Sequence, residues 1–266
     1  MCNKVKEEPP EFITVFQYEG KDPEPFKREG FMGLWKEGGQ SFLFFRGDLS
    51  DERELGLSDY TAKYVFRYWD WVGGEFTTFS VGNFTIRPPW EPVTNPLEIV
   101  IDPSVVFGSG LHPTTRDCLS LIDRLPNIPQ YALDLGTGTG ILAIALARKG
   151  IRVIAVDNNP LCLEVASRNL ALNKVGDSIT LVEGDILSLE LTFPELVVAN
   201  LGPDIIRAIL EKKDLRETKT LVLSGITRSF VGEIQDLMRE AGFHISEHLS
   251  DHVWHTLFGE KDPIEY

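Results

Sequence analysis

The sequence is poor in cysteine and has no long apolar segment. Its three cysteines, Cys2, Cys118 and Cys162, are odd in number and widely spaced, so we expect neither a disulfide framework nor a Cys-x-x-Cys metal clip. No apolar run approaches the roughly 20 residues that a membrane-spanning helix needs, and residues 1–10 contain no apolar signal core. These absences favour a soluble cytoplasmic protein without a membrane partner.

The chain also lacks an excess of positive charge. Among 266 residues, 40 acids and 26 bases give a formal charge of −14, and Lys and Arg form no cluster. Because phosphate binding draws its affinity from clustered Lys and Arg, direct nucleic-acid binding is not expected. A neutral or cationic substrate is favoured instead. Hydrophobic residues make up 42% of the chain, which is enough for a packed core.

Aromatic residues divide the chain into two unequal parts. Residues 1–95 hold 19 of the 27 Phe, Trp and Tyr residues. Residues 88–96 are rich in proline, which fixes φ and removes backbone donors, so a stiff extended connector is expected there. We predict a smaller α+β domain over residues 1–95 and a second domain over residues 96–266.

The first domain is expected to contain short strands and one helix. Its strands are predicted at residues 12–18, 31–36, 41–46, 77–80 and 84–87. The helix is predicted from Ser58 to Trp71, because Ser58 can cap the first turn and Tyr60, Tyr64 and Trp71 recur at intervals of four and seven.

The second domain alternates apolar strands with helices. Its strands are predicted at residues 132–135, 153–156, 179–182, 196–199 and 221–223, and its helices at 141–149, 160–173, 203–212 and 230–241. Strands that are apolar throughout are typical of sheets covered on both faces. The fold class is therefore predicted to be α/β, with a doubly wound parallel sheet.

A glycine-rich loop follows the first of these strands. Residues 134–140 read Asp-Leu-Gly-Thr-Gly-Thr-Gly. Gly136, Gly138 and Gly140 permit a sharp turn through positive φ and let a ligand approach the backbone closely. The next strand ends at Asp157, 21 residues after Gly136, where a carboxylate can accept both hydroxyls of a ribose. This layout predicts a cofactor that contains a nucleoside.

Two cofactor classes fit this loop. Gly138, Gly140 and Ala143 match a variant of the dinucleotide fingerprint, so a nicotinamide-dependent oxidoreductase is an alternative. Asp134 precedes the first glycine by two residues, however, and a carboxylate there suits a positively charged ligand better than a pyrophosphate. S-adenosyl-L-methionine carries an ammonium and a sulfonium group, and we favour it as the cofactor.

Two further motifs make the prediction more specific. Residues 107–115 read Phe-Gly-Ser-Gly-Leu-His-Pro-Thr-Thr, and residues 197–201 read Val-Val-Ala-Asn-Leu. With residues 134–140, they closely resemble the methyltransferase family that trimethylates large-subunit ribosomal protein eleven. The resemblance covers roughly residues 98–241. It implies a class I methyltransferase domain with a Rossmann-like fold, whose seven-stranded sheet ends in an antiparallel strand. Segments 243–249 and 253–258 would be the last two strands of this sheet.

The resemblance also implies roles for particular residues. Asp185 occupies a position where many class I methyltransferases bind the adenine amino group, the alternative being a loop carboxylate that faces solvent. Asn200 is the expected catalytic residue, since its side chain or backbone carbonyl could accept a hydrogen of the attacking amine. The cofactor-binding residues are expected to be Phe107, Gly108, Thr114, Thr115, Asp134, Gly136, Gly138, Gly140, Asp157, Asp185 and Asn200.

The implied reaction is methyl transfer to amine nitrogens of a protein, a lysine or N-terminal amine of a ribosomal protein. Another protein, RNA or a small molecule is an alternative acceptor, and a nonenzymatic protein that keeps the pocket is a third class. We name no general base, because His112 is expected to hold the shape of its loop. No metal site is predicted, since the four histidines after residue 243 lack accompanying carboxylate or thiol ligands.

The first domain departs from the family, in which it is a recognition module with a helix after its first strand. Here only residues 20–30 separate the first two strands, and Pro23 and Pro25 interrupt this segment. We expect that helix to be short or absent. Substrate specificity is therefore expected to depend on a domain that differs from its counterpart in the family.

Overall fold

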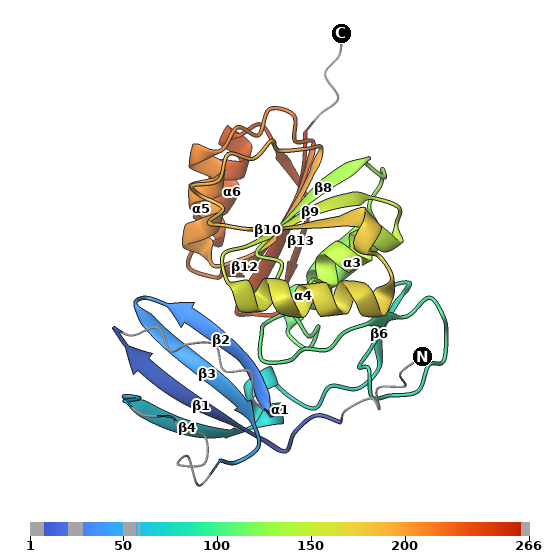
Figure 1. The fold of residues 1–266 in the computed structure, drawn as a ribbon. Coiled ribbons are helices and arrows are strands. Elements are labelled where there is room, and N and C mark those ends of the chain that lie inside the picture. Colours follow the sequence, from blue (N-terminus) through green and yellow to red (C-terminus); the bar gives the residue numbers. More distant parts are fainter. Residues whose placement is uncertain (1–7, 21–28, 50–56, 58, 262–266) are drawn as a thin grey trace.

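A seven-stranded sheet forms the centre of the second half of the chain (Figure 1). The computed structural model describes residues 8–20, 29–49, 57 and 59–261. The strands of this sheet are β8 (Tyr131–Leu135), β9 (Arg152–Asp157), β10 (Ile179–Glu183), β11 (Leu196–Asn200), β12 (Thr220–Thr227), β13 (His244–Ser250) and β14 (Trp254–Glu260). Their order is β10-β9-β8-β11-β12-β14-β13, parallel except for β14, which runs antiparallel to both of its neighbours. This order confirms the predicted α/β fold class.

Helices connect the strands and cover both faces of the sheet. They are α2 (Pro113–Asp123), α3 (Ile141–Arg148), α4 (Pro160–Asn173), α5 (Pro203–Lys212) and α6 (Val231–Glu240), with a short 3₁₀ helix, η2 (Gly176–Ser178), before β10. The start of α4 shows why the predicted bounds hold. The Asn159 side chain accepts a hydrogen bond from the Leu161 amide at 3.0 Å, and Pro160 occupies the first helical position. No helix in the described part of the chain is long and apolar enough to span a membrane.

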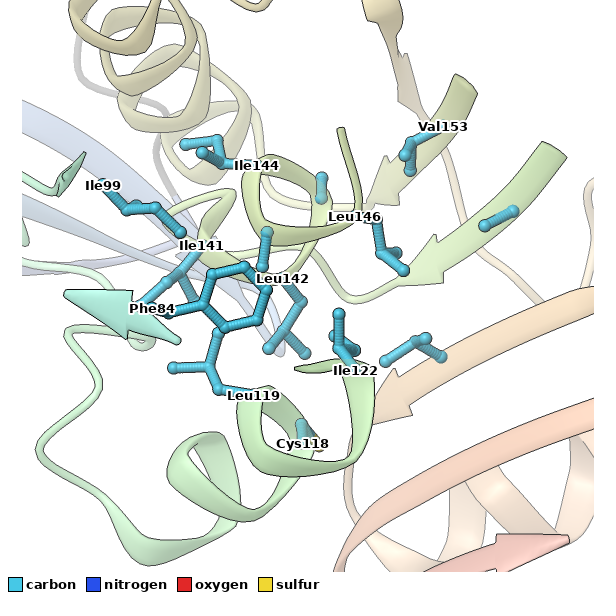
Figure 2. Packing of buried hydrophobic residues seen from close by; sticks show 14 of the residues in the cluster. Phe84, Ile99, Cys118, Leu119, Ile122, Ile141, Leu142, Ile144, Leu146 and Val153 are labelled. Carbon is cyan, nitrogen blue, oxygen red and sulfur yellow. The ribbon is translucent and has the colours of Figure 1, made fainter. Parts of the chain in front are cut away.

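Each face of the sheet carries its own apolar core. In β11, Leu196 and Val198 belong to the core that contains α2 and α3, whereas Val197 and Ala199 join the core that contains α5 and α6. Successive side chains of a strand point to opposite faces, so an uninterrupted apolar run fills both cores. Figure 2 shows the first core, where Phe84 lies beside Leu119 of α2 and Leu142 of α3.

The N-terminal region forms a four-stranded antiparallel sheet with the order β2-β3-β1-β4. Its elements are β1 (Phe12–Glu19), β2 (Phe31–Glu37), β3 (Gln40–Arg46), β4 (Ala62–Arg67) and the short helix α1 (Tyr68–Val72). Residues 21–28, where the family helix would fall, lie outside the described residues, as does residue 58.

The predicted helix from Ser58 to Trp71 is wrong. Its residues 62–67 instead pair with β1 as strand β4, and the helix begins only at Tyr68. Tyr64 and Phe66 stack with ring centroids 6.1 Å apart, which is the spacing of a strand whose alternate side chains share a face. Pairing with a neighbouring strand therefore outweighed the weak helical periodicity.

A small sheet links the two regions. It contains β5 (Phe79–Val81), β6 (Phe84–Arg87) and β7 (Ile99–Val100), and it packs into the core of α2 and α3. The connector between β6 and β7 is held by a buried ion pair, in which Arg87 Nε lies 2.8 Å from Glu98 Oε2. The proposed domain boundary at residues 95 and 96 falls inside this connector.

Candidate active site

A cavity of about 560 Å³ opens at the carboxyl ends of the parallel strands. Open α/β sheets bind their ligands at this edge. Seven of the predicted site residues line the cavity: Phe107, Thr114, Gly136, Gly138, Asp157, Asp185 and Asn200. The other four, Gly108, Thr115, Asp134 and Gly140, lie behind its wall and support it.

The glycine loop turns through positive φ as the sequence predicts, with φ of 77° at Gly136 and 53° at Gly138. A Cβ atom at Gly136 would lie 2.3 Å from Leu201 Cδ2, and one at Gly138 would lie 2.5 Å from the carbonyl oxygen of Phe107. The absence of side chains therefore serves the packing of the protein itself, while the backbone of both glycines faces the cavity.

Two glycines behind the wall join the loop to its surroundings. Gly108 accepts a hydrogen bond from the Thr139 hydroxyl at 2.6 Å, which docks residues 107–109 on the glycine loop. Gly140 is the N-cap of α3 and packs against Ala166 of α4, where a Cβ atom would lie 3.3 Å away. Both positions have positive φ.

Asp157 ends β9 and presents a nearly buried carboxylate to the cavity. Its Oδ2 accepts a hydrogen bond from the Gly138 amide, and its Oδ1 accepts one from the Asn159 amide, each at 3.0 Å. The Cys162 side chain is also hydrogen-bonded to this carboxylate. Since a carboxylate can accept about four hydrogen bonds, these three leave room for a donor in the cavity. The backbone amides thus fix the orientation of this carboxylate without saturating it.

Asp134 lies inside the protein instead of at the cavity wall. Its Oδ2 accepts hydrogen bonds from the Thr137 hydroxyl at 2.6 Å and the Ala143 amide at 3.2 Å, which ties the loop to the start of α3. Its Oδ1 is buried and has no partner among the described residues. Burial raises the pKa of Asp134 to about 6, although these hydrogen bonds act in the opposite direction. The expected position of this carboxylate directly beside the ligand is therefore not observed.

Asn200 is the last residue of β11, and the nitrogen and oxygen of its side-chain amide have different surroundings. Its Nδ2 donates to the hydroxyl oxygens of Thr114 at 3.1 Å and Thr115 at 3.4 Å. Its Oδ1 makes no hydrogen bond to any residue in the described part of the chain. Since Asn200 lines the cavity, this oxygen is available to a donor there.

His112 extends this network. Its Nδ1 accepts a hydrogen bond from the Thr114 amide at 3.4 Å and lies 2.7 Å from the Thr114 hydroxyl, so it caps α2. The ring packs edge-on against Phe107 and Trp254, with centroid distances of 5.4 and 5.1 Å. Burial lowers the pKa of His112, while the charge of Asp251 opposes this effect. A neutral ring that holds its loop agrees with the expectation from the sequence.

Asp185 is an exposed residue at the other end of the cavity. Its Oδ1 accepts a hydrogen bond from the Leu187 amide at 2.9 Å, and the preceding Gly184 amide donates to the carbonyl oxygen of Asp157. These bonds fix the loop after β10 beside the end of β9. Asp185 therefore lines the cavity and is exposed to solvent.

Two tryptophans in the cavity wall were missed from the sequence. Trp35 comes from β2, and Trp254 begins β14. Neither belongs to a motif around the glycine loop, and only the folded chain brings them there. The histidine pair His248 and His255 lies on β13 and β14 with Nε2 and Nδ1 2.8 Å apart, but the described residues contain no group of three or more side chains suited to a metal ion.

Comparisons with known proteins agree with this geometry. Residues 69–262 match the family model for ribosomal protein L11 methyltransferase (PrmA). The ribosomal protein L11 methyltransferase of Heliobacterium modesticaldum is 34% identical over 182 residues, covering 66% of this chain and 58% of that protein. The corresponding protein of Staphylococcus carnosus is 36% identical over 221 residues, covering 79% of this chain and 70% of that protein.

A solved structure gives the same relationship. The ribosomal protein L11 methylase of Lactobacillus delbrueckii subsp. bulgaricus has a TM-score of 0.60 at 27% identity, covering 70% of this chain and 100% of that chain. The chain spans only 57–59% of the length of several curated relatives that it matches. The matched region nevertheless includes all the residues of the glycine loop and its flanking motifs, and the chain belongs to the ribosomal protein L11 methyltransferase family.

Proposed function

We propose that the protein transfers methyl groups from S-adenosyl-L-methionine to amine nitrogens of a ribosomal protein. Its relatives are named for ribosomal protein L11, which makes that protein the first acceptor to test. The observation that carries the proposal is that Asn200 Oδ1, which has no hydrogen-bond partner among the described residues, lies in the same cavity as the Asp157 carboxylate. One group suits an amine hydrogen and the other suits ribose hydroxyls.

The donor set of the cavity supports this cofactor over a dinucleotide. Asp157 and Asp185 line the cavity, and no Lys or Arg among the described residues does. A pyrophosphate would lie near two carboxylates without a compensating cation, whereas an ammonium or sulfonium group is favoured there. We assign the ribose hydroxyls to Asp157, the adenine amino group to Asp185, and the remaining contacts to the backbone of Gly136 and Gly138.

The reaction requires orientation more than acid or base chemistry. When bound, the cofactor supplies a methyl group on a positively charged sulfur. The amine nitrogen forms the new bond to carbon as the carbon–sulfur bond breaks, and the electron pair of that bond goes to sulfur. Asn200 Oδ1 accepts a hydrogen of the neutral amine and so directs its lone pair. After transfer, the nitrogen carries a positive charge and loses a proton to solvent.

Two measurements test this proposal. Calorimetry should show binding of S-adenosyl-L-methionine and no binding of NAD. Incubation with methyl-labelled cofactor and purified ribosomal protein L11, followed by mass spectrometry, should place the label on lysine or N-terminal amines. Binding of NAD alone would refute the methyltransferase assignment. The same labelled cofactor is also incubated with a fractionated cell extract, and label in RNA or another protein instead of ribosomal protein L11 would refute the proposed acceptor.

A further inference from the structure

A second groove of about 430 Å³ meets the cofactor cavity beside the N-terminal sheet. Trp35, Phe107 and His112 line both the groove and the cavity, so the two hollows adjoin at these three side chains. Phe107 is 52% exposed at this junction. The volume of the groove falls within the range of about 300–1,000 Å³ that is typical of ligand pockets.

The walls of the groove are mostly apolar, with Ser109 and His112 as the polar side chains, and their positions are fixed by neighbouring elements. Trp71 Nε1 donates a hydrogen bond to the carbonyl oxygen of Val105 at 3.0 Å. This bond ties α1 to the loop just before residues 107–109, the segment that docks on the glycine loop. Val105 and Val106 are buried in the core that joins the N-terminal sheet to α4. Among the described residues, no acidic side chain, Lys or Arg lines the groove.

We propose that this groove binds the methyl acceptor, an aliphatic amine side chain of a polypeptide, and that its nitrogen enters the cavity past Trp35 and Phe107. This inference rests on the proposed function and adds the acceptor site to it. The groove removes water from the amine as it passes, and no carboxylate among the described residues lines it. In the cavity beyond, Asp157 and Asp185 are assigned to the ribose hydroxyls and the adenine amino group of the cofactor. Desolvation in the groove lowers the pKa of the amine and favours its neutral, nucleophilic form.

The chemistry of the groove also selects against other acceptors. A phosphate or carboxylate group would find no Lys or Arg in the lining, whereas the methylene groups of a lysine can pack on aromatic and aliphatic walls. Trp35 lies before residues 69–262, which match the family model. One wall of the acceptor site therefore comes from the part of the chain outside that match.

A binding experiment tests the groove without any methyl transfer. The protein is labelled with 5-fluorotryptophan, and the resonances of Trp35, Trp71 and Trp90 are assigned by single Trp→Phe replacements. Titration with n-hexylamine should shift the Trp35 and Trp71 resonances and leave Trp90, which does not line the groove, unchanged. Hexanoate, of the same length but opposite charge, should cause no shift. Unchanged Trp35 and Trp71 resonances, or equal shifts with hexanoate, would overturn the proposal.

A kinetic experiment compares two matched variants. Val72→Arg places a cation in the groove, and Val65→Arg places one on the exposed face of β4. With ribosomal protein L11 as acceptor, Val72→Arg should raise the acceptor KM by about tenfold or more, because the longer side chain fills part of the groove and its charge repels the ammonium group that arrives from solvent. Cofactor affinity should stay within about twofold, since Val72 lies outside the cavity lining.

The outcomes separate the two proposals. If wild-type protein methylates the acceptor and the two Arg variants behave alike, the groove assignment is wrong and the proposed function stands. If wild-type protein transfers no methyl group, the proposed function fails, and the fluorine titration still decides whether the groove binds an amine. Thermal unfolding of both variants shows whether Val72→Arg acts through loss of folding.

Discussion

Replacement of His112 tests whether the network behind Asn200 depends on a neutral imidazole. Nδ1 accepts the weak bond from the Thr114 amide, so it carries no proton, and the Thr114 hydroxyl at 2.7 Å donates to it. The same hydroxyl oxygen accepts a hydrogen bond from Asn200 Nδ2. His112 thus sets the direction of the hydroxyl hydrogen, which leaves the hydroxyl oxygen free to hold the Asn200 amide.

The magnitude follows from the two bonds. Loss of an N-cap side chain costs about 0.5–2 kcal/mol, and loss of one hydrogen bond about 0.5–1.5 kcal/mol. We expect His112→Ala to lower the free energy of unfolding by about 1–2 kcal/mol, which corresponds to a fall in Tm of about 2–8 °C for a chain of this size. His112→Asn should lose much less, since Asn is a preferred N-cap residue and its side-chain oxygen can accept both bonds.

The pH dependence distinguishes the two variants further. Burial lowers the pKa of His112, so the folded protein binds this proton less readily than the unfolded chain. The contribution of His112 is fully present above its ordinary pKa of about 6.5 and is lost as the pH falls through the lowered value. Unfolding at pH 7.5 and 5.5 should therefore show a smaller loss for His112→Asn than for wild type. Other titrating groups are present in both proteins and cancel in the difference. Equal losses would refute this account.

Three further changes address the cofactor wall. Asp157→Ala should weaken S-adenosyl-L-methionine binding by about 10- to 150-fold in calorimetry, because it removes acceptors of charge-assisted hydrogen bonds; unchanged affinity would contradict the ribose assignment. Gly138→Ala should lower the free energy of unfolding in urea by about 1–3 kcal/mol more than Gly150→Ala, where a Cβ atom meets nothing within 4 Å. Because burial raises the pKa of Asp134 to about 6, cofactor affinity should fall as the pH drops below that value and the negative charge is lost, and Asp134→Asn should abolish this dependence.

Local signals in the sequence predicted most helices and strands of residues 96–266. Helices α4 and α5 begin and end at the predicted residues, since a proline at the first helical position marks each start. The helix predicted at residues 58–71 was wrong because the spacing of the aromatic residues fits both the period of a helix and that of a strand. Tyr64 and Phe66 also fit a strand, and the free edge of β1 decided the outcome. A periodicity carried by a few aromatic residues cannot reveal such a partner.

The structure brings predicted residues from separate motifs together at the cavity, and it places one residue of the glycine-loop motif behind the wall. Asp157 and Asn200 end parallel strands, and the topology alone brings them to one edge of the sheet. Asp134 was placed beside the ligand, yet it lies between Leu133 and Leu135 in a buried strand. Alternation along that strand turns its side chain toward the opposite face, where α3 begins, so this correction was available from the sequence.

The position of Trp35 depends on a contact that no motif contains. Leu161, in the first turn of α4, packs against Gly33 of β2 so closely that a Cβ atom there would lie 2.2 Å from Leu161 Cδ1. The same helix begins at the Asn159 cap, whose amide also holds Asp157. One packed contact therefore ties β2, and with it the groove, to the loop after β9. That loop holds the Asp157 carboxylate, which is proposed to bind the cofactor. A change in this sheet can in this way alter the proposed acceptor site while the methyl-donor site stays the same.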